Sequence, residues 1–290
     1  MNLKNRPCIV CCYSEIALKG KNRHIFEARL IRNIKECLSR NKIEAEIKKL
    51  RGRIIIYTDD PKVTQHIRRV FGLSSISPAI EISSDLSTIS EFLPEYTRTH
   101  LSDQKTFRIT TKRPNKNFPS TSDSISYNLG AIIADKFNLK VNLKNPDLNL
   151  HIEIHRSTFI YHEKIPCQGG LPVGISGKIA CLINNQNDFL APWLLMKRGC
   201  RVAILSQDTQ DTSFLSQYDY GAPVTITNNV TIEDINEFIQ ENNCLALAVP
   251  DTLETFQPEK YQDIDIVILT PLIAYTDSKI NQSIDELKND

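Results

Sequence analysis

The chain has 290 residues, of which 41% are hydrophobic and 24% charged, a composition typical of an ordinary soluble globular protein of two or three domains. No apolar run approaches the roughly 20 residues of a membrane helix, and the apolar stretch 8–12 is too short for the core of a signal peptide. These features exclude a membrane-spanning protein and indicate a cytoplasmic one.

The net charge of +1 hides a strong asymmetry along the chain. Residues 1–70 carry 17 Lys and Arg against 7 Asp and Glu, a net charge of +10, whereas residues 171–290 carry 7 against 17, a net charge of −10. A polyanion would bind the first segment and be repelled by the last. The asymmetry therefore favours a nucleic acid as partner, bound by the N-terminal part.

Residues 1–78 predict a small ferredoxin-like domain. A loop with three cations, 13–23, precedes a helix whose apolar face includes Phe26 and Leu30. The expected elements are strand 9–12, helix 24–40, strands 43–50 and 53–57, helix 62–71 and strand 76–82. Their β-α-β-β-α-β order is the split βαβ pattern of ferredoxin-like domains.

Residues 79–166 predict a second domain built around a strand, a loop and a helix. Phe107, Ile109 and Thr111 alternate with polar residues, as in a half-buried strand, and two prolines end that strand in the loop 112–119. The segment 121–123 can then cap a helix. The other expected elements of this domain are helices 86–100 and 124–137 and strands 148–155 and 159–161.

The loop 112–119 combines three cations with Phe118, which we expect to be exposed. A stiff loop of this kind suits a phosphate backbone plus one stacked base. The alternative is an ordinary solvated connection between a strand and a helix.

Two groups of residues invite a metal interpretation. His151, Glu153 and His155 share one strand face, but residues four apart in a strand lie about 13 Å apart, too far for one ion, so we expect an exposed or RNA-facing surface. Cys8-x-x-Cys11 resembles half a zinc site without a second pair. We therefore predict no metal, while a cluster of Cys167, Cys181 and Cys200 stays open from residue counts alone.

Beyond a Gly- and Pro-containing linker, 169–174, strands alternate with helices over residues 175–290, which predicts a parallel α/β sheet. The helix expected at 231–243 begins with Thr231 as its cap. The other expected elements are strands 178–183, 201–205, 224–228, 244–249 and 264–269 and helix 189–198. The predicted fold class is therefore α+β followed by α/β.

At this point the chain resembles the tRNA 4-thiouridine synthetase family, in the form that lacks an appended rhodanese domain. The stretches that carry the resemblance are Tyr13 to Arg23 with Phe26 and Glu27, Lys112 to Ser122, Val141 to Asp147, Gly169 to Gly174, Leu194 to Gly199, and Leu269 to Tyr275. The resemblance implies a ferredoxin-like domain, a THUMP domain and a shortened, Rossmann-like PP-loop domain. In that family the first two domains hold the acceptor end of tRNA, and the last uses ATP to adenylate a uridine before sulfur replaces oxygen.

The chain departs from the family in the adenylating loop. The family motif Ser-Gly-Gly-x-Asp-Ser falls on a segment that keeps none of the required types, namely Ile183, Asn184, Asn185, Gln186, Asn187 and Asp188. The chemistry needs glycines so that backbone N–H groups can surround pyrophosphate. A carboxylate about 4 Å from a phosphate charge would repel it by roughly 4 kcal/mol. The family's second nucleotide signature is also missing from 248–255, and its catalytic cysteine has no clear counterpart.

We therefore interpret the chain as a tRNA-binding protein without catalytic residues, metal or cofactor. The residues predicted to contact RNA are Lys19, Lys21, Arg23, Arg108, Lys112, Arg113, Lys116, Asn117, Phe118, Ser120 and Ser122. Phe118 either stacks on a base or pins the loop. The third domain would serve structure, form a homodimer or recruit a partner modification enzyme.

Two alternatives remain. The first is an active tRNA uridine 4-sulfurtransferase that uses ATP at a rebuilt site, with Cys167, Cys181 or Cys200 handling sulfur. The second is a protein-interaction scaffold without RNA, which would leave the basic N-terminal segment unexplained. Nucleotide binding would separate the first alternative from our interpretation, and tRNA binding would separate both from the scaffold.

Overall fold

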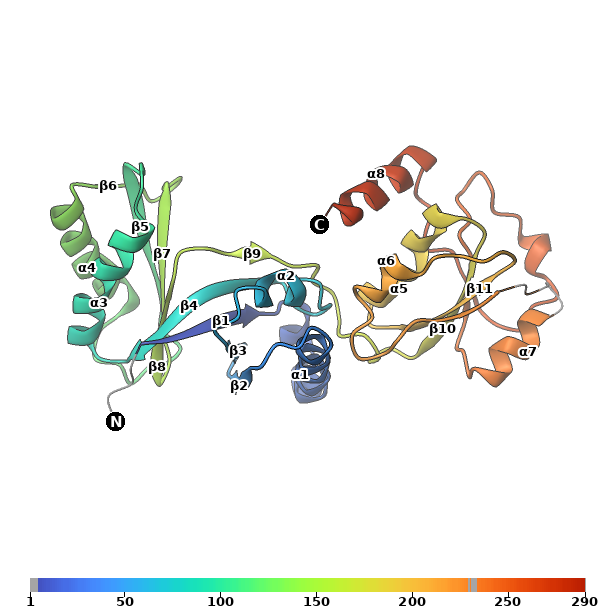
Figure 1. Cartoon of the computed structure of the whole chain (residues 1–290), viewed down its shortest axis with the longest axis horizontal. Helices are drawn as coiled ribbons and strands as arrows, with labels where there is room; N and C mark the ends of the chain where they lie inside the picture. Colours follow the sequence, from blue (N-terminus) through green and yellow to red (C-terminus); the bar gives the residue numbers. More distant parts are fainter. Residues whose placement is uncertain (1–4, 229, 231–233, 290) are drawn as a thin grey trace. The chain divides into compact units, whose positions relative to one another are not determined.

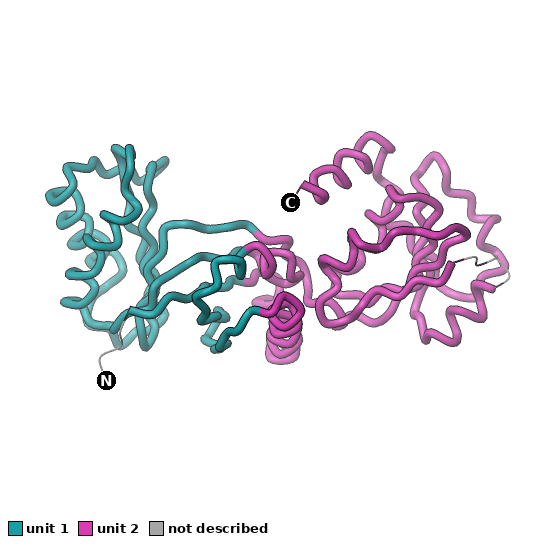
Figure 2. Tube along the Cα trace, viewed as in Figure 1, with its two compact units in different colours: residues 1–12, 43–64, 75–166 teal, residues 13–42, 65–74, 167–290 magenta. Residues whose placement is uncertain are grey.

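The computed structural model describes residues 5–228, 230 and 234–289 (Figure 1). The chain forms two compact units (Figure 2). Unit 1 contains residues 1–12, 43–64 and 75–166, and unit 2 contains residues 13–42, 65–74 and 167–290. No helix in the described part of the chain is long and apolar enough to cross a membrane.

Unit 1 is built on a nine-stranded sheet with the order β2-β3-β1-β4-β8-β7-β5-β6, in which β9 also pairs with β4. The strands are β1 Arg6–Cys12, β2 Glu46–Leu50, β3 Arg53–Tyr57, β4 Ser75–Ser83, β5 Thr106–Lys112, β6 Lys140–Val141, β7 Leu148–Ile154, β8 Ser157–Tyr161 and β9 Ile165–Pro166. β4 pairs with β1 on one side and with β8 on the other. Strands from both predicted N-terminal domains therefore share one continuous sheet.

Two helices of unit 1, α3 (Leu86–His100) and α4 (Ser122–Phe137), pack against the β5–β7–β8 part of this sheet. Asp85 caps α3 by accepting the N–H of Thr88, and Thr121 caps α4 by accepting the N–H of Ser124. Apolar residues of both helices join Phe107 and Ile109 in one buried cluster. The cap predicted at 121–123 is thus confirmed, and it fixes where α4 begins.

Unit 2 contains a five-stranded parallel sheet with the order β12-β11-β10-β13-β14. Its strands are β10 Lys178–Ile183, β11 Arg201–Ser206, β12 Thr225–Thr227, β13 Leu247–Ala248 and β14 Ile268–Leu269. Its helices are η1 Glu15–Leu18, η2 Gly20–Asn22, α1 Arg23–Arg40, η3 Gln186–Phe189, α5 Leu190–Lys197, α6 Ser213–Ser216, α7 Asp234–Glu241, η4 Pro258–Tyr261 and α8 Asp277–Lys288. The short helix α2, Val63–Ile67, spans the division between the units.

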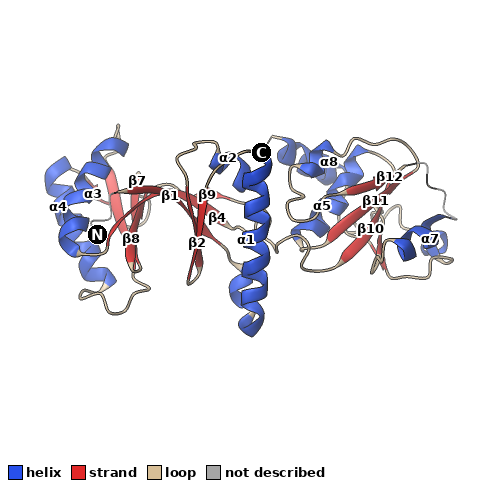
Figure 3. Cartoon of the chain, turned by 60° about the horizontal axis from the view of Figure 1, so that its bottom comes forward, coloured by secondary structure: helices blue, strands red, loops and turns tan. Residues whose placement is uncertain are grey.

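The parallel sheet is covered on both faces (Figure 3). Ile179 and Cys181 of β10 face a cluster with α5, α6 and α8, whereas Ala180 faces a cluster with α7. Burial on both faces explains why these strands read as almost continuous apolar runs.

Several predicted elements differ from the structure. Helix 62–71 is reduced to α2, because turns follow it as far as Gly72, whose φ is +104°. The strands predicted at 244–249 and 264–269 shrink to two residues each, and α6 and α8 were not predicted. The predicted cap Thr231 lies outside the described residues. The domain boundaries 1–78, 79–166 and 175–290 stay a prediction. The two compact units each combine several separate segments of the chain, so their limits do not test these boundaries.

Candidate nucleic-acid interface

The loop between β5 and α4 is braced by its own side chains and by hydrogen bonds to the end of β7. The backbone N–H of Asn115 donates to the carbonyl of Ile154, and its side-chain amide donates to the carbonyl of His155, both at 3.1 Å. Arg113 Nη1 donates to the carbonyls of Lys116 and Phe118, at 2.8 and 2.9 Å. The side chain of Arg113 therefore stiffens the loop from within, while Lys112 and Lys116 are exposed.

Phe118 is not the exposed aromatic residue that the sequence suggested. Its side chain is 7% exposed and belongs to the cluster with Ile125 and Leu129 of α4, so the prediction of an exposed ring is wrong. Burying the ring in this cluster removes apolar area from water. The burial favours the second of the two roles considered for Phe118, which is to pin the loop.

The exposed aromatic residue near this loop is Tyr127 of α4, whose side chain is 79% exposed. It lines a hollow of about 580 Å³ together with Arg108, Thr111 and Gly130. Sequence reasoning missed Tyr127, although it falls outside the apolar face of its helix, and that position was a usable signal.

The other predicted loop residues lie in the same unit. Arg108 Nη1 donates to the carbonyl of Leu143 at 3.0 Å, and the backbone N–H of Asn117 donates to Asn115 Oδ1 at 3.1 Å. Ser120 precedes α4 and Ser122 is its first residue, and both are half-buried.

Glu153 lies buried at the base of the loop, with 1% of its surface exposed. Arg53 binds this carboxylate in a bidentate manner, with Nε 3.0 Å from Oε2 and Nη2 2.9 Å from Oε1. The Tyr161 hydroxyl also donates to Oε1, at 2.8 Å. Lys112 Nζ lies 3.7 Å from the same Oε1. Burial alone would raise the pKa of the Glu153 carboxyl, but the interactions with His155, Arg53 and Tyr161 hold it well below its usual range.

His151 and His155, the neighbours of Glu153 on this strand face, are buried as well. The prediction that this face is exposed is wrong, because Arg53 and Tyr161 cover Glu153 and the Tyr161 ring stacks on His151. Burial, followed by the positive charges of Lys164 and Lys112, lowers the pKa of His151 to about 4. The described residues contain no group of three or more His, Cys, Asp or Glu arranged to hold a metal ion.

The three cations predicted in the N-terminal loop belong to unit 2. Lys19 Nζ lies 5.1 Å from the centre of the Phe26 ring, and Arg23 Nε donates to Glu27 Oε1 at 3.1 Å. Lys21 is exposed. Two of the three cations thus have partners within their own unit, and Lys21 is presented to solvent.

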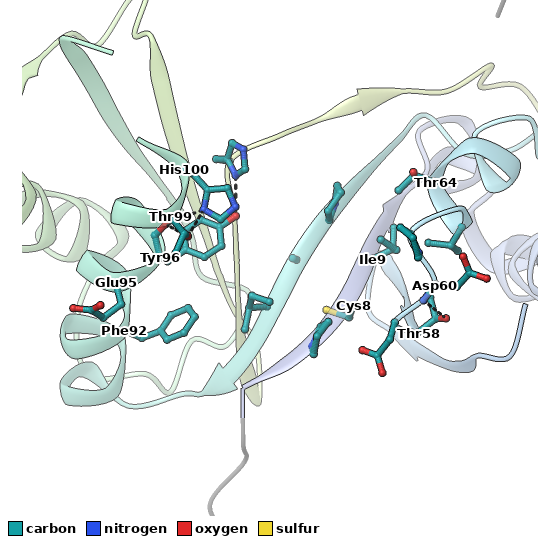
Figure 4. Close-up of a pocket in the computed structure, with 18 residues that line it drawn as sticks. Cys8, Ile9, Thr58, Asp60, Thr64, Phe92, Glu95, Tyr96, Thr99 and His100 are labelled. Carbon is teal, nitrogen blue, oxygen red and sulfur yellow. Dashed lines mark hydrogen bonds between the residues drawn. The ribbon is translucent and has the colours of Figure 1, made fainter. Parts of the chain in front are cut away.

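A cleft of about 650 Å³ in unit 1 lies over β1 and β4 (Figure 4). On one wall the Tyr96 hydroxyl is 2.9 Å from His162 Nδ1, and the ring centres of His100 and His162 are 4.2 Å apart. Among the described residues that line this cleft there is no lysine or arginine. The cleft therefore lacks the charge that a phosphate backbone requires.

The predicted nucleotide loop, 183–188, joins β10 to η3 in unit 2. Asp188 is buried, and its Oδ2 accepts the backbone N–H groups of Asn184 and Asn185, at 2.8 and 3.2 Å. Asn185 Oδ1 accepts the N–H of Asn187 at 2.9 Å. The donors that would surround a phosphate are bound to the loop's own side chains.

A cavity of about 670 Å³ opens at this loop, and its lining includes Asp188, Asp251 and Asp277. Burial, and then the charge of Asp251, raise the pKa of Asp188, although its two N–H partners oppose that shift. None of the described residues that line the cavity is a lysine or arginine. The residues present therefore do not fit the triphosphate of ATP, the cofactor that the family resemblance implies.

The cysteines considered for sulfur chemistry have environments that oppose ionisation. Cys181 and Cys200 are buried, and burial raises the pKa of both thiols. A nucleophilic cysteine instead needs a lowered pKa and an electropositive surrounding. Cys167 is half-buried in the linker.

Two segments match known domain families. Residues 8–77 match the ThiI ferredoxin-like domain, and residues 83–163 match the THUMP domain. Together with the braced cationic loop, these matches define the class: the chain is a THUMP protein with a ferredoxin-like domain before the THUMP domain.

Curated relatives narrow that class. The chain is 40% identical over 194 residues to a probable tRNA sulfurtransferase of Thermoanaerobacter sp. (strain X514), an alignment that covers 66% of this chain and 50% of the relative. It is 38% identical over 200 residues to the probable tRNA sulfurtransferase of Mycoplasmopsis synoviae (strain 53), with 68% and 51% covered. The chain spans about half the length of these relatives. It is a THUMP protein related to the tRNA sulfurtransferases, as its motifs predict.

Two solved structures share the fold. PH1313 from Pyrococcus horikoshii Ot3 matches with a TM-score of 0.85 and 28% identity, over 98% of this chain and 100% of that one. A 4-thiouridine synthetase in complex with RNA and ATP matches with a TM-score of 0.80 and 22% identity, over 97% and 85%. The predicted fold class, with ferredoxin-like, THUMP and PP-loop-type parts, is confirmed.

Proposed function

We propose that this protein binds tRNA in the cytoplasm as a component of tRNA modification. The observation that carries the proposal is the braced loop 112–118 of the THUMP domain, which presents Lys112 and Lys116 to solvent. A rigid loop loses little conformational entropy on binding, so its cations can contact phosphates at low cost. The acceptor end of tRNA is the expected target, because the related family holds that end with the same two domains.

Tyr127 is the residue that would stack on an unpaired base. Its ring is exposed beside Arg108, in the hollow between β5 and α4. An exposed aromatic ring next to a guanidinium suits a nucleotide, since bases stack on aromatic rings while cations hold the phosphates.

The third domain is proposed to be inactive in adenylation. The hydrogen bonds from Asn184 and Asn185 to Asp188, together with the acidic lining of the cavity, support this assignment. The domain would then serve structure, a homodimer or the recruitment of a partner modification enzyme.

The test is the salt dependence of tRNA binding by the Lys112→Ala, Lys116→Ala double variant. If both lysines contact phosphates, the slope of log K against log salt should fall by roughly 1.5 to 2. The Lys105→Ala, Lys140→Ala variant is the matched control, because these exposed lysines lie at the opposite end of β5. An unchanged slope in the test variant, or no binding by the wild-type chain, would contradict the proposal.

An active tRNA uridine 4-sulfurtransferase is the second candidate, and the names of the curated relatives favour it. The two readings differ in nucleotide affinity. Calorimetry with ATP and magnesium should detect no binding if the third domain is inactive. Measurable ATP binding, with thiolation of tRNA by the purified chain, would establish the sulfurtransferase instead.

A further inference from the structure

The hairpin formed by β2 and β3 carries cations that the functional assignment does not yet use. β2 lies at one end of the nine-stranded sheet, and Lys48 and Arg51 are exposed. Gly52 makes the turn with a φ of +78°, a conformation that suits glycine. Glu46, the acidic residue of this hairpin, is paired with Arg6 at 2.7 Å.

One sheet face links this hairpin to the RNA-binding loop. Cross-strand partners point to the same face, and the register pairs Leu50 with Arg53 and Lys48 with Ile55, so Lys48 shares the face of Arg53. On β5 and β7, Lys112 is paired with Glu153. Arg53 of β3 contacts Glu153 of β7, so this face of the sheet connects the strand pair β2–β3 with the strand pair β5–β7.

The Arg53–Glu153 ion pair sets the position of the hairpin tip. Arg53 Nη1 donates to the carbonyl of Gly52 at 2.7 Å, while its other nitrogens hold the buried carboxylate. Lys112 Nζ contacts the same carboxylate oxygen as Arg53 Nη2. The exposed residue Arg51 lies two residues before Arg53, whose guanidinium contacts the same carboxylate as Lys112 at the start of the loop 112–118.

The charge around this junction is positive. Arg53 and Lys112 share a single carboxylate, Glu153, and Lys164 lies close enough to Lys112 for the two cations to repel each other. Burial and this repulsion lower the pKa of Lys164. A phosphate group would offset such repulsion, whereas a cationic or apolar partner would not.

We propose that the β2–β3 hairpin is a second phosphate-binding segment, and that Lys48 and Arg51 contact the same RNA backbone as Lys112. This inference rests on the proposed tRNA binding and adds the β2–β3 hairpin of the ferredoxin-like part to the surface that contacts RNA. The Arg53–Glu153 pair holds the two segments at a fixed spacing.

The test compares tRNA binding by wild-type protein, the Lys48→Ala, Arg51→Ala variant and the Lys105→Ala, Lys140→Ala control across a salt series. The hairpin variant should lose about tenfold in affinity at low salt and lower the salt slope by roughly 1.5 to 2, with the control unchanged. If the wild-type protein binds tRNA and the hairpin variant binds with an unchanged slope, the hairpin inference is overturned and the proposed function stands. If the wild-type protein binds no tRNA, both are overturned.

The ion pair is tested separately by Glu153→Gln, with Glu95→Gln as control, because Glu95 is paired with Arg98 on an exposed helix face. In the Glu153→Gln background, adding Lys48→Ala and Arg51→Ala should cost clearly less than tenfold, since the hairpin is no longer held in place. A full tenfold effect there would overturn the positioning role of Glu153. If Glu153→Gln does not fold, the surface variant alone still decides whether the hairpin binds phosphate.

Discussion

The loops 112–118 and 183–188 occupy equivalent places, each between a strand and the helix that follows it, yet their polar groups are arranged in opposite ways. In loop 112–118, hydrogen bonds from Arg113 within the loop and from Asn115 to the carbonyl of His155 leave Lys112 and Lys116 facing solvent. In loop 183–188, internal hydrogen bonds to Asp188 consume the backbone donors themselves. The comparison teaches that a stiff loop binds a ligand only through the groups that its own bracing leaves unused.

The largest expected effect would test the bracing of the first loop. Phe118→Ala should lower the free energy of unfolding by about 3–5 kcal/mol, the usual cost of removing a buried phenylalanine ring. Tyr127→Ala is the matched control, because its exposed ring should change stability by less than about 0.5 kcal/mol. Urea unfolding followed by circular dichroism measures both, and equal losses would mean that Phe118 does not pin the loop.

Tyr127, whose loss should hardly affect stability, should instead affect the affinity for tRNA. Tyr127→Ala should weaken tRNA binding by about 1–3 kcal/mol if its ring stacks on a base. Tyr127→Phe keeps the ring and should bind like the wild-type protein.

A third prediction concerns how the stability of the protein depends on pH through His151. His151 has a folded-state pKa of about 4, below the value of about 6.5 in an unfolded chain, so the unfolded state binds more protons between these values. Stability should therefore fall by about 3 kcal/mol as the pH drops from 6.5 to 4.

The control for this pH dependence is His151→Phe, which keeps a ring where His151 stacks on Tyr161. The variant should lose less stability than the wild-type protein over the same pH range, as measured by thermal unfolding at several pH values. If the stability of the two proteins changes with pH in the same way, His151 is not the cause of the loss of stability at low pH.

How far the sequence could predict these sites depends on the range of the interactions involved. Alternation and capping are local, so β5, α4 and the Thr121 cap followed directly from the residues. The contact between Arg53 and Glu153 joins residues a hundred positions apart through the curl of a shared sheet, and no local pattern encodes it. Glu153 therefore read as an exposed strand residue although it is buried.

In the loop 183–188 the sequence predicts which residues are present but not how their side chains are oriented. The absence of glycine at 183–188 was visible in the sequence, and so was a carboxylate at Asp188. The direction of that carboxylate, which points back to the N–H groups of its own loop, needed the structure. Likewise Phe118 appeared exposed because its neighbours are polar, whereas its burial depends on the apolar face of α4.

The smallest expected effect tests whether the loop 183–188 is closed by its own carboxylate. Asp188→Ala frees the N–H groups of Asn184 and Asn185 and should lower stability by about 1–2 kcal/mol, the range for losing a capping side chain. Inorganic phosphate should then raise the melting temperature of the variant and leave the wild-type protein unchanged, because only the variant has unused donors and one carboxylate fewer. Asp277→Ala is the control, since it removes a carboxylate from the same cavity without freeing these donors. If phosphate stabilises Asp277→Ala as much as Asp188→Ala, the acidic lining alone excludes anions, and the contrast between the two loops lies in their charge rather than in their bracing.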